Sequence, residues 1–255
     1  MTYITEFATL LDDAARNAKG VDQIDPGSKM ALADAYAIQS ASIQKRVARG
    51  EKRVGVKMGF TSRSKMVQMG LNDVIWGRLT DAMLVEEGAK TAFSKYVHPR
   101  AEPEIAFVLK KELAGHVTAV EALAAVEAIA PAIEIIDSRY KDFKFSLPDV
   151  IADNASSSGF VIGPWCDPRQ DFSNLGLALQ IDGKVVQVGS TAAILGHPLR
   201  SLVAAARLSA EAGEPLQAGW VVMAGGATAA EWIKPGNYVS VEMEKLGSCG
   251  FHVGE

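Results

Sequence analysis

The sequence is poor in the residues that would mark several classes of protein. It contains two cysteines, Cys166 and Cys249, which are too few for a disulfide framework or a thiolate metal cage. It also has no excess of basic residues, since 26 Lys and Arg against 30 Asp and Glu give a formal net charge of −4. Because nucleic acids and anionic membranes are bound by basic surfaces, we expect neither as a partner.

Long apolar runs are missing as well. A membrane-spanning helix needs about 20 apolar residues, and the best run, at 119–136, is interrupted by three glutamates and a proline. The first twenty residues lack the basic-then-apolar order of a secretory signal and include Glu6, Asp12 and Asp13. We therefore expect a protein of the cytoplasm.

The first fifty residues carry helical periodicity. Apolar residues recur at helical spacing between Phe7 and Ala15 and again between Leu32 and Val47, with a break at 20–27. Neither predicted helix carries a cluster of chemically active side chains. Residues 1–53 are therefore predicted to form a helical packing layer.

From residue 54 the pattern changes to short apolar runs bounded by glycine, which is typical of strands. The pair Asp182-Gly183 lies between two apolar segments and predicts a hairpin within 175–188. The remaining predictions are strands at 54–59, 104–109, 132–136, 238–244 and 249–253, and helices around 119–130 and 201–212. The predicted fold class is α+β, with the helical portion 1–53 and a β-rich, mixed-sheet catalytic body 54–255 integrated into one domain.

Three glutamates lie in or beside apolar runs, where an ionised carboxylate is costly. Glu102 and Glu104 begin one predicted strand and face the same side because they are two residues apart. Glu134 lies in the middle of another run. Carboxylates gathered in this way, without histidine or thiolate ligands, favour a hard divalent cation such as Mg²⁺ or Mn²⁺. The alternative is a solvated edge strand, consistent with Pro103, with Glu134 paired to an arginine.

Lys57 lies between apolar residues on a predicted strand flanked by glycines. It either occupies a pocket as a cation or proton donor, or extends along the surface to water. The sequence Ala-Gly-Gly-Ala-Thr at 224–228 follows a Val-Val-Met strand, and such a turn can bring backbone N–H groups to an anion. It lacks the lysine and the spacing of a nucleotide-binding loop. The polar run 153–158 is interpreted as a turn from the sequence alone.

Several of these segments occur in the same order as in a known family. They are Gly-Val-Lys-Met-Gly-Phe-Thr-Ser at 55–62, Glu-Pro-Glu at 102–104, Glu-Ile-Ile-Asp-Ser-Arg-Tyr at 134–140, Ala-Asp-Asn-Ala-Ser-Ser at 152–157, Leu-Gly-His-Pro-Leu at 195–199 and Leu-Gly-Ser at 246–248. Together they resemble the 2-oxopent-4-enoate hydratase and 4-oxalocrotonate decarboxylase family, within the fumarylacetoacetate hydrolase superfamily. The resemblance runs from about Tyr36 to the C-terminus.

The resemblance implies a fold and a set of site residues. The implied fold is a small helical N-terminal part followed by a mixed β-roll, and the implied cofactor is Mg²⁺, with Mn²⁺ as an alternative. The matching positions are Glu102, Glu104 and Glu134 for the metal, Lys57 for catalysis, and Ile75, Ser156, Gly226 and Thr228 for substrate binding. Ala224 departs from the family, which commonly has a threonine there.

Differences within the family favour its decarboxylase branch. Hydratases tend to carry an aspartate where this chain has Ile75, and Gly-Ala-Leu-Gly where it has Gly-Gly-Ala-Thr at 225–228. The segments 65–66 and 68–70 also match the decarboxylase branch. An aspartate can activate water for hydration and an isoleucine cannot. Decarboxylation needs a poorly solvated carboxylate, which the apolar Ile75 and Trp76 would favour at the departing end.

The expected reaction is decarboxylation of 4-oxalocrotonate (2-oxohex-3-enedioate) to 2-hydroxypenta-2,4-dienoate and CO₂, in meta-cleavage catabolism of aromatic compounds. We expect Lys57 to stabilise charge on the C2 oxygen rather than to form a Schiff base. The alternatives are hydration of 2-hydroxypenta-2,4-dienoate and non-catalytic binding of a metal or small molecule. The family resemblance further implies a homo-oligomer and a complex with the pathway hydratase.

Overall fold

The structure is a computed structural model that describes residues 2–68 and 72–255. Residues 69 and 70, with the side chains of Lys65 and Gln68, belong to the branch prediction and lie outside the described residues. The helices are α1 (Tyr3–Arg16), α2 (Leu32–Ala48), α3 (Arg63–Gln68), α4 (Ala119–Ala125), α5 (Leu147–Ala152) and α6 (Pro198–Glu211). Short 3₁₀ helices are η1 (Asp81–Met83), η2 (Phe93–Lys95), η3 (Lys141–Phe143), η4 (Asn154–Ser156) and η5 (Thr191–Ala193).

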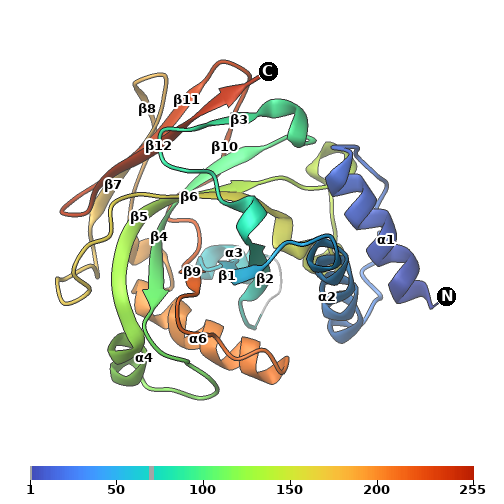
Figure 1. Cartoon of the computed structure of the whole chain (residues 1–255), viewed down its shortest axis with the longest axis horizontal. Helices are drawn as coiled ribbons and strands as arrows, with labels where there is room; N and C mark the ends of the chain where they lie inside the picture. Colours follow the sequence, from blue (N-terminus) through green and yellow to red (C-terminus); the bar gives the residue numbers. More distant parts are fainter. Residues whose placement is uncertain (1, 69–71) are drawn as a thin grey trace.

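Two mixed sheets form the body of the molecule (Figure 1). The larger has seven strands, β1 (Arg53–Gly59), β2 (Ile75–Thr80), β4 (Arg100–Leu109), β5 (Val126–Ile136), β6 (Ser157–Ile162), β9 (Val221–Met223) and β10 (Glu231–Trp232). The smaller has five, β3 (Lys90–Ala92), β7 (Gly176–Ile181), β8 (Lys184–Ser190), β11 (Tyr238–Met243) and β12 (Gly247–Gly254).

The seven-stranded sheet has the order β2-β1-β9-β4-β5-β6, and β10 pairs with Arg100 and Ala101 at the start of β4. Only the β1–β9 pair is parallel, and its other neighbouring strands run antiparallel. The sheet curls enough for β6 to contact β2, strands from opposite ends of the order. Side chains from β1, β4 and β5 can therefore meet inside the curve.

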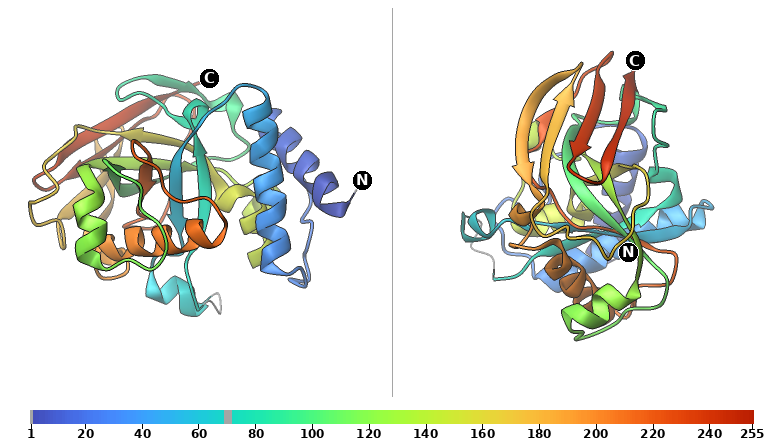
Figure 2. Two further views of the ribbon diagram at one scale, coloured as in Figure 1. Left: turned by 60° about the horizontal axis from the view of Figure 1, so that its bottom comes forward. Right: turned by 90° about the vertical axis from the view of Figure 1, so that its left-hand side faces the viewer.

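The five-stranded sheet, in the order β3-β12-β11-β7-β8, lies across β4, β5 and β6 (Figures 1 and 2). Apolar residues of both sheets form one buried core. The predicted hairpin joins β7 to β8, and both Asp182 (φ 54°) and Gly183 (φ 75°) adopt the left-handed conformation that a two-residue hairpin turn of type I′ requires.

The N-terminal helices lie at one side of the large sheet (Figures 1 and 2). α1 packs on α2, and α2 packs on α5, so that Leu11 and Ile38 share a core with Ile75 and Ile151 of the body. Gln39 of α2 donates hydrogen bonds to two buried backbone carbonyls, on β2 and α5. The helical layer therefore supports the strand that carries Ile75.

The structure confirms the α+β prediction and most of the predicted elements. The predicted helix at 119–130 is wrong in its second half, because α4 ends at Ala125 and β5 begins at Val126. A capping box of Thr118 and Glu121 fixes the start of this helix. Beyond Val126, pairing of β5 along the whole of β4 overrides the helical propensity of the alanines.

Among the described residues, no helix is both long and apolar enough to cross a membrane.

Candidate metal centre and active site

The three predicted ligand glutamates converge. Glu102 and Glu134 are directly opposite each other in the β4–β5 pair, and Glu104 follows on the same face of β4. One carboxylate oxygen from each residue lies within 4.8 Å of the others. Because β4 runs between β9 and β5, the alternative of a solvated edge strand is wrong.

Lys57 on β1 points into the same cluster and is 3% exposed. Its Nζ lies 3.0 Å from Glu134 Oε2 and donates a hydrogen bond of 2.9 Å to the backbone carbonyl of Ala155. The surface alternative for this lysine is therefore wrong. Glu134 does pair with a cation, but the partner is a lysine and not the arginine considered from the sequence.

Burial controls the protonation of the cluster. Burial raises the pKa of Glu104 well above its usual range, and the charge of Glu134 raises it further. Burial also raises the pKa of Glu134, although Lys57 opposes that shift. Burial lowers the pKa of Lys57, but the charges of Glu134, Glu104 and Glu102 outweigh it and the net shift is upward. Lys57 is therefore an ammonium, and the buried carboxylates favour either a proton or a metal ion.

The backbone contact to Lys57 comes from a strained loop. Asn154, Ala155 and Ser156 have φ values of 52°, 51° and 59°, a conformation that costs a non-glycine residue about 1–3 kcal/mol. Asn154 stabilises it, because its Oδ1 accepts a hydrogen bond from Arg78 N (2.7 Å) and its Nδ2 donates one to Arg78 O (2.9 Å). The polar run 153–158 therefore forms a turn, as predicted. This turn directs the Ala155 carbonyl at Lys57.

The glycine-rich turn after β9 packs against the carboxylates. Gly225 N donates a 2.7 Å hydrogen bond to Glu104 Oε2. Gly225 has φ +112°, and a Cβ at this position would lie 2.1 Å from Thr61 Oγ1. A Cβ at Gly226 would lie 3.0 Å from the Glu102 carboxylate. The anion that this turn binds is therefore a side chain of the protein. Gly225 is required by its close approach to Thr61, whereas a Cβ at Gly226 would require only a small shift of the Glu102 carboxylate.

A cavity opens above the cluster. Lys57, Glu102, Ser156 and Gly226 line its polar part. Its apolar wall consists of Met58, Phe60, Ile75, Ile136, Phe143, Phe145, Val150 and Ala155.

Three of the four predicted substrate residues, Ile75, Ser156 and Gly226, therefore lie on this cavity. Thr228 is not among its lining residues. Its hydroxyl donates to the carbonyl of Ala229. Its methyl group packs against Gly189, where an added Cβ would lie only 2.6 Å from it. A substrate contact by Thr228 stays a prediction.

The residues present fit a divalent metal ion. Glu104 Oε1 and Glu134 Oε1 are buried without a hydrogen-bond partner in the described part of the chain, which is costly unless another group satisfies them. Because all three donors are carboxylates, the set suits a hard cation such as Mg²⁺.

Three residues that support the site were not predicted from the sequence. Arg139 forms an ion pair with buried Asp153 and also donates to its backbone carbonyl. Gln39 Nε2 donates to Trp76 O (3.2 Å) and Ile151 O (2.7 Å). Arg139 and Asp153 belong to the segments 134–140 and 152–157, which carry the family resemblance. Their place in these segments was the feature of the sequence that could have indicated a role. Gln39 lies on a helix without a cluster of chemically active side chains, so no feature of the sequence indicated its role.

The curled mixed sheet with helices at its side, the carboxylate triad and the buried lysine together define a class of metal-binding α+β protein. Residues 49–254 match the family described as fumarylacetoacetate (FAA) hydrolase, C-terminal. The chain belongs to the fumarylacetoacetate hydrolase family.

Individual relatives narrow the comparison. A 4-oxalocrotonate decarboxylase of Pseudomonas sp is 56% identical over 248 residues, which cover 97% of each chain. A 2-keto-4-pentenoate hydratase of Paraburkholderia xenovorans (strain LB400) is 35% identical, over 95% of this chain and 92% of the hydratase. Among solved structures, 4-oxalocrotonate decarboxylase from Pseudomonas putida G7, complexed with magnesium and adipate, gives a TM-score of 0.95 at 38% identity and covers 99% of this chain and 98% of that one.

Proposed function

We propose that the protein is a carbon–carbon lyase that decarboxylates 4-oxalocrotonate to 2-hydroxypenta-2,4-dienoate and CO₂, with Mg²⁺ held by Glu102, Glu104 and Glu134. The observation that carries this proposal is the division of the cavity into a charged part around Lys57 and an apolar wall that includes Ile75. The higher identity to a decarboxylase than to a hydratase supports the same choice.

The reaction moves one pair of electrons away from the departing carboxylate. The C5–C6 bond breaks, its electrons form the C4=C5 bond, and the C3=C4 electrons form C2=C3. The C2=O π electrons move onto the C2 oxygen, where negative charge collects, and C6 leaves as neutral CO₂. The C2 oxygen then takes one proton from water to become the hydroxyl group of the product. When bound, Mg²⁺ supplies the Lewis acidity that polarises the C2 carbonyl.

Lys57 is suited to stabilise the developing charge. An ammonium has three N–H donors, and within the described residues two of its directions are taken by Glu134 and the Ala155 carbonyl. The third is available for a substrate oxygen. Since both contacts fix the side chain before substrate arrives, its field acts on the transition state without reorganisation.

The apolar wall acts on the other end of the substrate. Ile75 is 5% exposed and lies where a hydratase would need an acid to activate water. No carboxylate other than Glu102 lines the cavity among the described residues. A carboxylate against such a wall is poorly hydrated, so conversion to uncharged CO₂ is favoured.

Side-by-side assays test the proposal. With Mg²⁺, purified protein should release CO₂ from 4-oxalocrotonate and produce 2-hydroxypenta-2,4-dienoate. Hydration of the dienoate without release of CO₂ would assign the chain to the hydratase activity. Metal binding without turnover of either compound would make it a binding protein.

We also propose a homo-oligomer that acts in the cytoplasm and associates with the pathway hydratase. Supporting this, Val185 and Val188 on the edge strand β8 are 56% and 73% exposed, and exposed apolar edges are typical of interfaces. Light scattering of the purified protein should give a mass above that of one 27.1 kDa chain. Co-expression with the hydratase should yield a complex that elutes together in gel filtration.

A further inference from the structure

Arg100 lies next to the carboxylate cluster in the same row. Arg100, Glu102 and Glu104 alternate along β4 and therefore face one side of the sheet. Directly opposite Arg100 on β5 is Ile136, which lines the cavity. Two residues along a strand span about 6.6 Å, a distance comparable to the length of a six-carbon dicarboxylate.

Arg100 does not itself line the cavity, but it lies beside Ile136 and Phe143, which do. Met223 pairs with both Lys57 and Ala106, so Glu104, Glu102 and Arg100 lie progressively beyond the level of Lys57. In the same direction β1 ends at Gly59, which pairs with Ile75. Arg100 and Ile75 are therefore both beyond Lys57, at the end assigned to the departing carboxylate.

Two aromatic rings lie against the Arg100 guanidinium. Its central carbon lies 4.1 Å from the ring centre of Phe143 and 3.7 Å from that of Trp232. Phe143 lines the cavity and is held in place by a backbone with φ +56°, following Asp142 at φ +58°. The two rings are perpendicular, with centres 5.7 Å apart, so they flank the guanidinium from two sides and restrict its orientation.

This arginine differs from the other arginines buried nearby. Arg46, Arg53, Arg78 and Arg139 each form an ion pair with a carboxylate. Arg100 forms no ion pair or hydrogen bond with any described residue, and its Nε is buried without an acceptor. A fixed cation with unused donors at the edge of a substrate cavity is typical of an anion-binding group.

We propose that Arg100 binds the second carboxylate of a dicarboxylate substrate, the one that departs as CO₂, and so selects dicarboxylates over monocarboxylates; this inference rests on the proposed function. The carboxylate loses its charge as C5–C6 breaks, while charge grows near Lys57. Arg100 therefore stabilises bound substrate more than the transition state. Its removal should raise KM without lowering kcat, whereas loss of Lys57 should lower kcat.

Binding of unreactive acids tests this assignment separately from turnover. Adipate and hexanoate have the same chain length but two and one carboxylates, and calorimetry with Mg²⁺ present measures each. Arg100→Met should weaken adipate binding by about 10- to 100-fold, as expected for a hydrogen bond to a charged group, and leave hexanoate unchanged. Arg169→Met, at an exposed arginine paired with Asp167, is the matched control and should change neither.

Arg100→Lys keeps the charge without the planar, forked guanidinium, so its adipate affinity should lie between those of wild type and Arg100→Met. Retained Mg²⁺ affinity and an unchanged melting temperature show that a variant is folded. Wild-type adipate affinity in folded Arg100→Met, an equal loss for both acids in the two Arg100 variants, or a lower kcat at unchanged KM would overturn the assignment. If wild type released no CO₂ but Arg100→Met still lost adipate selectivity, the proposed reaction would fail while the binding role stood.

Discussion

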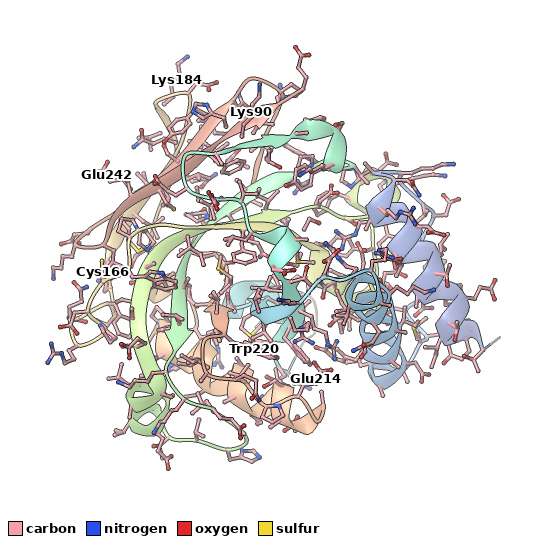
Figure 3. The ribbon with its side chains drawn as sticks, in the orientation of Figure 1. Lys90, Cys166, Lys184, Glu214, Trp220 and Glu242 are labelled. Atoms are coloured by element: carbon pink, nitrogen blue, oxygen red, sulfur yellow. The ribbon has the colours of Figure 1, made fainter. Side chains whose placement is uncertain are left out.

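The two sheets of the molecule differ in whether they bury charged side chains. The seven-stranded sheet buries Lys57, Arg78, Glu104 and Glu134 on four of its strands. The five-stranded sheet buries no charged side chain on any of its strands, all of which are described. Its charged residues, such as Lys90, Lys184 and Glu242, project outward from the sheet (Figure 3).

The difference separates stability from function. Removing a charge from water costs several kcal/mol, about as much as a whole domain's margin of stability. A sheet can form a core without this cost, as the five-stranded sheet does with residues such as Leu179 and Val241. We infer that Lys57, Glu104 and Glu134 serve ligand binding, whereas Arg78 is neutralised by its ion pair with Glu214. Changes to the first three residues should affect the metal and turnover before they affect folding.

The sharpest test of this contrast is Lys57→Met. It should lower kcat by about 10²–10³, the effect of losing one transition-state donor, while Mg²⁺ binding is retained. Steady-state kinetics and calorimetry measure the two quantities. Lys184→Met, an exposed lysine of the five-stranded sheet, should leave both unchanged. Borohydride with substrate should leave no adduct, and a reduced adduct on Lys57 by mass spectrometry would replace electrostatic stabilisation with Schiff-base chemistry.

The metal ligands come next in expected effect. Glu102→Gln, Glu104→Gln and Glu134→Gln preserve shape but remove charge, so each should weaken Mg²⁺ binding by roughly 10- to 100-fold or more. The metal-free protein should melt at the same temperature or higher after Glu104→Gln, because glutamine replaces a buried carboxyl that must be either protonated or kept ionised at a cost.

Glu242→Gln, on the exposed side of the five-stranded sheet, is the matched control. Unchanged Mg²⁺ affinity in all three ligand variants would contradict the assignment of the metal site.

How far the sequence could predict this site depends on the range of each interaction. The convergence of Glu102 and Glu104 is local, since a strand alternates its faces every residue. Their pairing with Glu134 is not local, because it depends on the register between β4 and β5. The sequence indicated it only through the place of Glu134 in an apolar run and through the family resemblance. The geometry at Ala155 was beyond prediction, since its strained backbone depends on Asn154 bonding to Arg78 on another strand.

The fold shows the same limit. The β7–β8 hairpin was predictable because its turn residues, Asp182 and Gly183, determine the geometry locally. The alanine-rich segment after Ala125 was mispredicted as helix because pairing with β4, rather than propensity, decides its conformation. The contact of Arg100 with Phe143 and Trp232 joins three separate segments, and no local pattern indicates it.

Competition between protons and Mg²⁺ for the buried glutamates should change the metal affinity by a smaller amount. Since burial raises the pKa of Glu104 and Glu134, the metal-free cluster holds protons at a pH where exposed carboxylates would be ionised. Mg²⁺ must displace them, so its apparent affinity should rise with pH, by up to about tenfold per unit for each proton released.

Calorimetry in buffers of different ionisation enthalpy measures the protons released. The release should be smaller in Glu104→Gln. Affinity independent of pH, with no proton release, would mean that the cluster is already fully ionised before metal binds.

The smallest effect on the site should come from the core of the five-stranded sheet. Leu179 on β7 is fully buried and pairs across the sheet with Val241. Leu179→Ala should lower the free energy of unfolding by about 2–5 kcal/mol, because it removes apolar contacts and leaves a cavity. Denaturant unfolding measures this loss. At a temperature where the variant stays folded, its kcat and Mg²⁺ affinity should equal those of wild type, because no charge near Lys57 has changed. A fall in kcat as large as that of Lys57→Met, with folded protein confirmed by circular dichroism, would show that the two sheets are coupled and that the separation of stability from function is wrong.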